Sequence, residues 1–124
     1  VHGAGGLDEA SLAGPNQVQM IEAGVITPRT IAPEDVGLKQ APLEALQGGD
    51  LATNQDILRS VLQGRGSRAQ IDVVAFNTAL VLWAAGREMD LTKAVQQALD
   101  VIGNGLPWQR LEALRVALAD ENGE

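Results

Sequence analysis

The feature that most constrains the fold is a helical stretch, from about Arg68 to Ala85, whose apolar residues lie almost all round the helix axis. Those residues are Ile71, Val74, Ala75, Leu80, Leu82 and Trp83. A helix that is apolar on every side is stable in water only when other elements cover it. The sequence therefore predicts that this helix is buried at the centre of the core and that Gly86 ends it.

Three more helices are predicted, so that residues 48–124 form the helical part of the chain. Residue types that favour a helix start precede each of them, and two are followed by a glycine that favours a helix end. The expected starts and ends are Thr53 or Asn54 with Gly64, Asp90 with Gly103, and Pro107 at the start of the last helix.

Residues 1–47 are rich in glycine, proline and β-forming residues, and this pattern predicts strands and loops. Residues 16–22 and 25–31 are two short runs joined by two residues, which predicts a β-hairpin. Pro28 has no N–H to donate, so the second strand is expected at a sheet edge or interrupted there. A one-turn helix or a turn, with Pro33 first and Gly37 at its end, is expected next.

Together these segments predict an α/β fold in one domain over residues 1–124. A partial mixed sheet, made of a strand at the start of the chain plus the hairpin, is expected to pack with about four α-helices. The length fits one domain, because domains cluster at roughly 100 to 150 residues.

The composition excludes several classes of function. The net charge is −7 and the only aromatic residues are two tryptophans and one phenylalanine, whereas nucleic-acid binding needs basic clusters or aromatic stacking platforms. No apolar run reaches the roughly 20 residues that span a bilayer, so no membrane partner is expected. The chain has no cysteine, which excludes disulfides and thiolate zinc sites and leaves the cytoplasm as the default location.

The candidate metal site is the acidic pair Asp8 and Glu9 in the glycine-rich segment HGAGGLDE. Two carboxylates on a flexible loop suit Mg²⁺, which takes one or two carboxylates together with waters and phosphates. Taken alone, such a pair is more often a solvated surface feature. The segment does not fit a phosphate-binding loop, since no helix begins near Leu7, and His2 is the single histidine, so no catalytic triad is predicted.

Other polar residues are weighed in the same way. Asn77 lies within the apolar helix and is expected to bond to the backbone of a neighbouring loop rather than to a ligand. Arg65 and Arg68 suit an anion, but a solvated loop or a helix C-terminal cap is favoured. Glu34 and Asp35 are expected to favour the dipole of a short helix, and no ligand is assigned to them.

Three segments in this order resemble one enzyme family over essentially the whole chain. They are HGAGGLDEASLAGPNQVQMIEAG, TIAPEDVGL and GGDLATNQDILRSVLQGRGSRAQIDVVAFNTALVLWAAG. The order is similar to that in the carboxy-terminal part of the anthranilate phosphoribosyltransferases. Pyrimidine nucleoside phosphorylases share the architecture, so the resemblance implies a nucleoside phosphorylase/phosphoribosyltransferase-type α/β domain.

The resemblance implies a Mg²⁺-dependent transfer of phosphoribose from phosphoribosyl pyrophosphate to anthranilate, with release of pyrophosphate, in tryptophan biosynthesis. It assigns Mg²⁺ binding to Asp8 and Glu9 and places no catalytic residue in this chain. The family's main substrate loops and its helical dimerisation domain would precede Val1. The parent enzyme is therefore expected to be a homodimer, and the chain alone is expected to be inactive.

Two other interpretations remain open from the sequence. The first is a nucleoside phosphorylase-related protein, which binding of a nucleoside rather than anthranilate would reveal. The second is a noncatalytic helical interaction module. An incomplete sheet exposes strand edges, so self-association through such an edge is expected.

Overall fold

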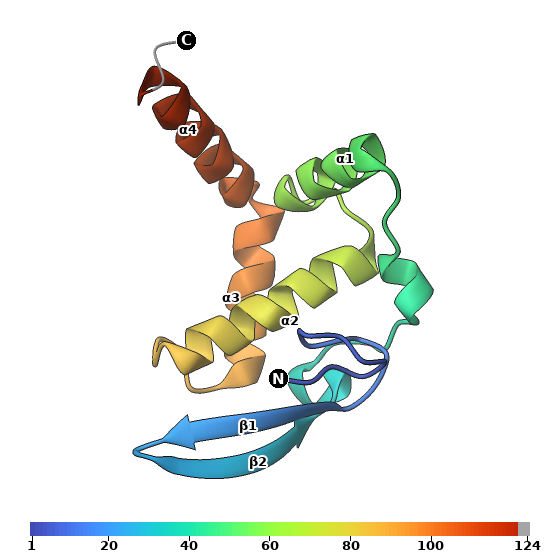
Figure 1. The fold of residues 1–124 in the computed structure, drawn as a ribbon, viewed down its shortest axis with the longest axis vertical. Helices are drawn as coiled ribbons and strands as arrows, with labels where there is room; N and C mark the ends of the chain where they lie inside the picture. The colour runs from blue at the N-terminus through green and yellow to red at the C-terminus, as the bar shows by residue number, and fades with distance from the viewer. Residues whose placement is uncertain (122–124) are drawn as a thin grey trace.

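The computed structural model describes residues 1–121. The elements are β1 (Asn16–Glu22), β2 (Val25–Ile31), the 3-10 helices η1 (Pro33–Val36) and η2 (Leu43–Leu46), and the helices α1 (Leu51–Leu62), α2 (Arg68–Ala84), α3 (Leu91–Gly103) and α4 (Leu106–Glu121). The hairpin lies along one side of α2, and α4 projects away from the rest of the molecule (Figure 1). The α/β composition with four helices agrees with the sequence-based prediction.

The predicted hairpin is confirmed in both strands and in its turn. Its antiparallel register runs from Asn16 opposite Ile31 to Glu22 opposite Val25. Ala23 and Gly24 between the strands both have positive φ, at 48° and 79°. Such a two-residue turn matches the right-handed twist of paired strands. β2 continues through Pro28 as an edge strand, which is one of the two expected outcomes.

The sheet differs from the mixed sheet that was expected. The start of the chain does pair with β1, because His2 and Gln17 exchange backbone hydrogen bonds of 2.8 and 2.9 Å. This pairing is antiparallel, as is the hairpin, and no parallel pairing occurs within residues 1–121. The physical reason is that the loop between His2 and β1 turns the chain back on itself. A parallel neighbour would require a long crossover connection.

The core lies where α2 packs against α3 and against the loop that precedes β1. Ala75, Phe76 and Ala79 of α2 are completely buried, so the prediction of a central helix is confirmed for this face. The opposite face differs from the prediction, because Val74 and Val81 are 37% and 67% exposed. This face is only partly covered, since Val74 borders a cavity that residues of η2 and α1 also line.

The helix caps of α3 and α1 differ in how well the sequence predicted them. Asp90 caps α3 as expected, since its Oδ1 accepts hydrogen bonds from the N–H groups of Thr92 and Lys93. The start predicted for α1 was wrong, because Asp50 caps this helix and accepts a hydrogen bond of 2.9 Å from the N–H of Thr53. Asn54 instead bonds to the backbone of Gly49 through both of its amide atoms.

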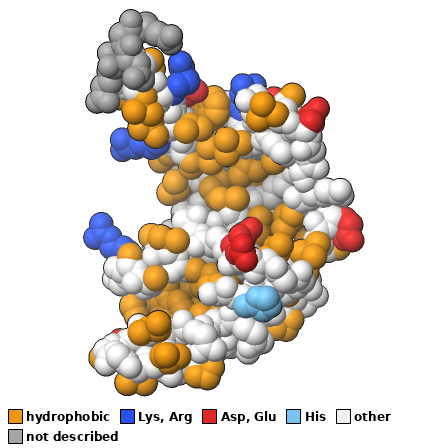
Figure 2. All heavy atoms as spheres, viewed as in Figure 1, with side chains coloured by type: hydrophobic (Ala, Val, Ile, Leu, Met, Phe, Trp, Pro, Cys, Tyr) orange, Lys and Arg blue, Asp and Glu red, His pale blue; other side chains and the backbone are white. Residues whose placement is uncertain are grey.

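α4 begins next to Pro107 as predicted, but none of its side chains over residues 106–119 is fully buried. Leu114 and Leu118 are about half exposed. Hydrophobic side chains gather on the face between α1 and α4 and along α2 (Figure 2). Among residues 1–121, none of the helices is both long enough and apolar enough to cross a membrane.

Candidate functional site

The acidic pair lies on a loop that begins with a tight turn. The N–H of Gly3 donates to the carbonyl of Leu7 at 2.8 Å, and the N–H of Gly6 donates to the carbonyl of Gly3 at 3.0 Å. Gly5 and Gly6 have φ values of 85° and 86°, which L side chains rarely adopt. The glycines in this segment therefore define one closed turn, and Asp8 follows directly after it.

Gly3 also lets the two ends of this turn approach one another. A Cβ atom on Gly3 would collide with the carbonyl oxygen of Glu9 and would lie 3.1 Å from the Cβ of Leu7. The backbone of the acidic pair thus packs directly on the strand-like start of the chain. A glycine is required here because of this close approach rather than because of a positive φ.

Asn16, the first residue of β1, fixes both ends of the loop. Its side chain is completely buried, and its Oδ1 accepts hydrogen bonds from the N–H groups of Ala4 (3.1 Å) and Ser11 (2.7 Å). Its Nδ2 donates to three carbonyl oxygens, those of Ser11, Gly14 and Ile31. One amide therefore ties the loop to itself and to the end of β2.

Asn77, on α2, makes a second attachment to the loop. Its Oδ1 accepts a hydrogen bond of 2.9 Å from the N–H of Ala10, and its Nδ2 donates to the carbonyl of Ala10 at 2.9 Å. A third bond, of 3.0 Å, runs from Nδ2 to the carbonyl of Val73. The prediction that Asn77 bonds to the backbone of a neighbouring loop is confirmed, and that loop carries the acidic pair.

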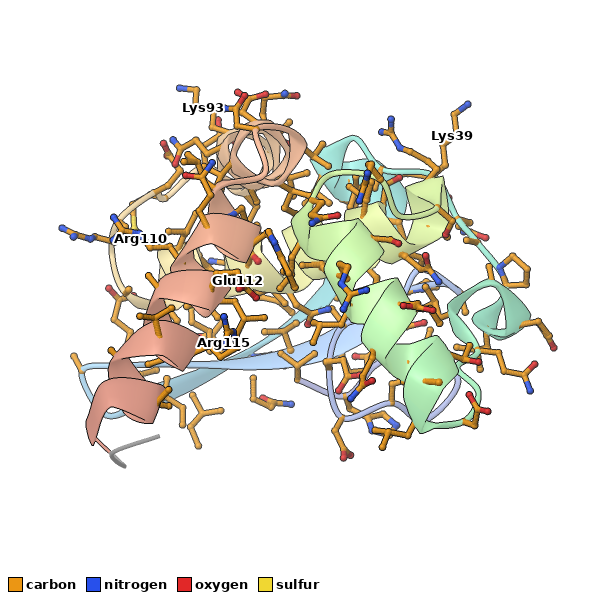
Figure 3. All side chains as sticks on the ribbon, turned by 90° about the horizontal axis from the view of Figure 1, so that it is seen from above. Lys39, Lys93, Arg110, Glu112 and Arg115 are labelled. Atoms are coloured by element: carbon orange, nitrogen blue, oxygen red, sulfur yellow. The ribbon has the colours of Figure 1, made fainter. Side chains whose placement is uncertain are left out.

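The side chains of Asp8 and Glu9 are exposed and engage no other described group. No hydrogen bond or ion pair involves either carboxylate within residues 1–121. The basic side chains of Lys39 and Lys93 point outward from the molecule (Figure 3). Because neither carboxylate is bonded to another described group, the oxygen atoms of Asp8 and Glu9 remain available to bind a ligand. The described part of the chain contains no cluster of three His, Asp or Glu residues able to hold a metal ion.

A cavity of about 590 Å³ opens beside the loop. Leu7 and Glu9 line it together with residues of η2, α1 and α2, among them Leu43, Ile57 and Val73. Glu9 is the only charged residue in this lining. The volume falls within the range of about 300 to 1,000 Å³ that is usual for small-molecule pockets. A carboxylate of the acidic pair therefore borders an otherwise largely apolar space.

The other polar residues considered from the sequence have partners of their own. Arg68 donates from Nε to Oδ2 of Asp72 at 2.8 Å, and Arg65 donates to the side chain of Gln63. Asp35 accepts a hydrogen bond of 2.8 Å from the N–H of Ala32 at the start of η1. Asp35 thus supports the start of η1, as expected. Arg68 differs from the expectation of a solvated loop or a C-terminal cap, because it is the first residue of α2 and pairs with a residue of the same helix.

Sequence reasoning missed Asn16 and Asp72. Asn16 follows Gly14-Pro15, a turn signal, and a polar residue at the start of an apolar strand is the pattern that points to a backbone cap. Asp72 is buried, and its sequence signal is the arginine four residues before it on the same helix. Neither residue was singled out, because their burial depends on how the helix and the hairpin pack.

Known proteins resemble this chain closely in sequence. The anthranilate phosphoribosyltransferase of Synechococcus sp. (strain CC9902) is 62% identical over an alignment of 125 positions, which covers 100% of this chain and 36% of that protein. The enzyme of the same name from Prochlorococcus marinus (strain MIT 9313) is 59% identical and is covered to 35%. The chain thus spans about a third of the length of these curated relatives.

Solved structures agree with these relatives. Anthranilate phosphoribosyltransferase from Thermus thermophilus has a TM-score of 0.78 at 37% identity, over 87% of this chain and 32% of that one. The Saccharomyces cerevisiae enzyme in complex with PRPP and Mg has a TM-score of 0.76 at 26% identity, over 89% and 32%. A family model described as "Glycosyl transferase family, a/b domain" matches residues 1–107, and the chain therefore belongs to this glycosyl transferase family.

Proposed function

We propose that Asp8 and Glu9 bind Mg²⁺ and that this chain is the metal-binding part of an anthranilate phosphoribosyltransferase. The observation that carries the proposal is the pair of free, exposed carboxylates on a loop that Asn16 and Asn77 hold in place. The similarity to an enzyme solved with PRPP and Mg supports the same function. The reaction would transfer phosphoribose from phosphoribosyl pyrophosphate to anthranilate and release pyrophosphate, as a step of tryptophan biosynthesis.

The residues present fit Mg²⁺. This cation prefers oxygen ligands and is usually held by one or two carboxylates, while waters and substrate phosphates complete its coordination. The loop offers two carboxylates, and neither is paired with a basic side chain in the part of the chain that the structure describes. Any further ligands would come from water, from the substrate or from other parts of the full-length protein.

Magnesium would supply charge neutralisation for the departing pyrophosphate. The contribution of this chain is to hold Asp8 and Glu9 at fixed positions, so that little reorganisation is needed when substrate binds. We propose no catalytic residue in this chain and no turnover by the chain alone, since its relatives are nearly three times as long. A cytoplasmic, homodimeric parent enzyme belongs to the same proposal.

Isothermal titration of the chain with Mg²⁺ in the presence of pyrophosphate tests the site. The double variant Asp8→Asn, Glu9→Gln is expected to lose most of the magnesium-dependent binding. The matched control is the double variant Glu22→Gln, Glu34→Gln, which also removes two negative charges. Both of these side chains are exposed and form no hydrogen bond or ion pair among the described residues. Equal titrations for wild type and the Asp8, Glu9 variant would remove the site assignment.

In the full-length protein the same double variant is expected to lower turnover and to weaken the dependence of the rate on Mg²⁺. The control variant is expected to leave both properties unchanged. An unaltered magnesium dependence in a steady-state assay with both substrates would contradict the proposal.

A further inference from the structure

We propose that Asn77 is a positioning residue for the metal-binding carboxylates, acting through the backbone of Ala10. This inference rests on the proposed function of Asp8 and Glu9. Asn77 touches neither carboxylate. It makes two hydrogen bonds of 2.9 Å with the residue that follows Glu9 in the chain, and these bonds join positions 67 residues apart.

The geometry of the contact suits positioning. A primary amide carries one acceptor and one donor side by side, and these match the N–H and C=O of a single residue. Because both backbone groups of Ala10 are held, the peptide planes on either side of it are fixed, including the one that leads to Glu9. The additional bond to Val73 holds the Asn77 side chain to its own helix.

The attachment closes a short segment. Asn16 holds the N–H groups of Ala4 and Ser11, and Asn77 holds both backbone groups of Ala10, so residues 5–9 lie between anchored residues. Two of these five residues are Gly5 and Gly6, which have the greatest backbone freedom of all residue types. Without the anchor at Ala10, Asn16 alone holds the segment at its two ends, through Ala4 and Ser11. The backbone next to Glu9 would then sample more conformations, and the carboxylates would have to be ordered when metal binds.

Of the two anchors, Asn77 makes hydrogen bonds that involve fewer parts of the fold. Asn16 bonds to Ile31 and so takes part in the hairpin as well as in the loop. Asn77 bonds only to Ala10 and to its own helix. A change at Asn77 therefore tests the loop without breaking the pairing of β1 with β2.

The experiment compares Asn77→Ala with Thr78→Val in the full 124-residue chain. Thr78 is the next residue on α2, and its hydroxyl bonds only to the carbonyl of Val74, at 2.8 Å, on the exposed side of the helix. Mn²⁺, which is visible by electron paramagnetic resonance, serves as the probe in the presence of pyrophosphate. Amide hydrogen exchange of residues 5–10 is measured on the same proteins without metal.

We expect Asn77→Ala to weaken Mn²⁺ affinity by about tenfold or more, as is usual when a residue that orients a ligand is lost. Exchange of the Ala10 amide, and of the Gly6 amide that closes the turn, is expected to become faster. Thr78→Val is expected to change neither quantity. If Asn77→Ala does not fold, Asn77→Ser replaces it and is expected to show the same changes at a smaller size.

Two results would overturn the inference. One is unchanged Mn²⁺ affinity in a folded Asn77 variant, whether or not its exchange changes, and the other is an equal loss of affinity in Thr78→Val. Failure of the proposed function looks different. In that case Asp8→Asn, Glu9→Gln retains the Mn²⁺ affinity of wild type, whereas the exchange data for Asn77→Ala still report whether this residue fixes the loop.

Discussion

Gln17 and His2 direct both of their backbone groups toward each other, with hydrogen bonds of 2.8 and 2.9 Å. In an antiparallel strand the backbone groups of successive residues point to opposite sides. The backbone N–H and C=O groups of Gln17 and Gln19 therefore point away from β2. The backbone groups of Thr30 and Pro28, which lie opposite them on β2, point away from β1. Pro28 lies opposite Gln19. A residue other than proline at this position would have its N–H on the free edge of β2, so the proline removes a donor from that edge.

This placement predicts that Pro28 limits pairing of the free edge with a second strand. Pro28→Thr restores the missing donor and is expected to increase self-association, since an unbroken edge is a template for strand pairing. Ile26→Thr is the matched control, because it creates the same side chain at an edge position that already has its N–H. Light scattering over a concentration series measures the effect. A Pro28→Thr protein no more associated than Ile26→Thr would contradict the prediction.

A second prediction concerns the ion pair inside α2. Asp72 is 2% exposed, its Oδ2 is paired with Arg68, and its Oδ1 has no hydrogen-bond partner among the described residues. Arg68→Ala would leave a buried carboxylate with no partner, which costs about 1–3 kcal/mol of unfolding free energy. Because Arg68 itself is exposed, solvent screening favours the lower part of that range.

Urea unfolding measures this loss of unfolding free energy, and two further variants serve as comparisons. Arg115→Ala removes an ion pair of 3.3 Å with Glu112 on the same side of α4 (Figure 3), where both side chains are partly exposed. Its expected cost is below about 0.5 kcal/mol. Asp72→Leu added to Arg68→Ala is expected to recover stability, because both partners are then absent. Equal effects of Arg68→Ala and Arg115→Ala would refute the role of burial.

A third prediction follows from the cap of α1. The N–H of Thr53 donates to Asp50 and lowers the pKa of the Asp50 carboxyl below its ordinary value of 3.8. A pKa that is lower in the folded state stabilises the fold above pH 3.8, and this contribution is lost as pH falls through the lowered value. Asp50→Asn keeps a capping oxygen but does not titrate.

Thermal unfolding of wild type and Asp50→Asn over a pH series tests this sign. We expect wild type to have the higher Tm near neutral pH and the difference to shrink below pH 3.8. The ionised carboxylate also interacts favourably with the N-terminal end of the helix dipole, and this interaction disappears on protonation. A Tm difference that stays constant across the acid range would show that charge at Asp50 does not contribute.

The accuracy of the sequence-based predictions depends on how local the determining interactions are. The hairpin was predicted correctly because two residues, Ala23 and Gly24, set its turn and register. The predicted start of α1 was wrong by a few residues. Asp50, Thr53 and Asn54 are all residue types that cap helices, and only the loop geometry selects Asp50. The exposed face of α2 was not foreseen, because residue periodicity does not reveal which neighbours are present to cover an apolar surface.

The candidate site shows the same division. Asp8 and Glu9 were found as a pair adjacent in sequence, and Asn77 was found as a polar residue in an apolar helix. Their connection through Ala10 spans 67 residues and requires the folded arrangement of α2 against the loop. The resemblance to an enzyme family indicated the chemistry of the pair, but only the hydrogen bonds show how the chain holds it.

The last prediction tests the close approach between Gly3 and Glu9. In Gly3→Ala the new Cβ would collide with the Glu9 carbonyl oxygen, so either the start of the chain or the acidic pair must move. Such overpacking costs about 1–3 kcal/mol. Gly14→Ala is the control: its new Cβ would lie 3.6 Å from that of Ala4, an ordinary contact, so a change within about 0.5 kcal/mol is expected. Both variants are measured by urea unfolding and by Mg²⁺ titration. A displaced Glu9 is expected to weaken metal binding in Gly3→Ala and not in Gly14→Ala. Equal stability and equal Mg²⁺ binding of the two variants would show that the loop tolerates the added methyl group.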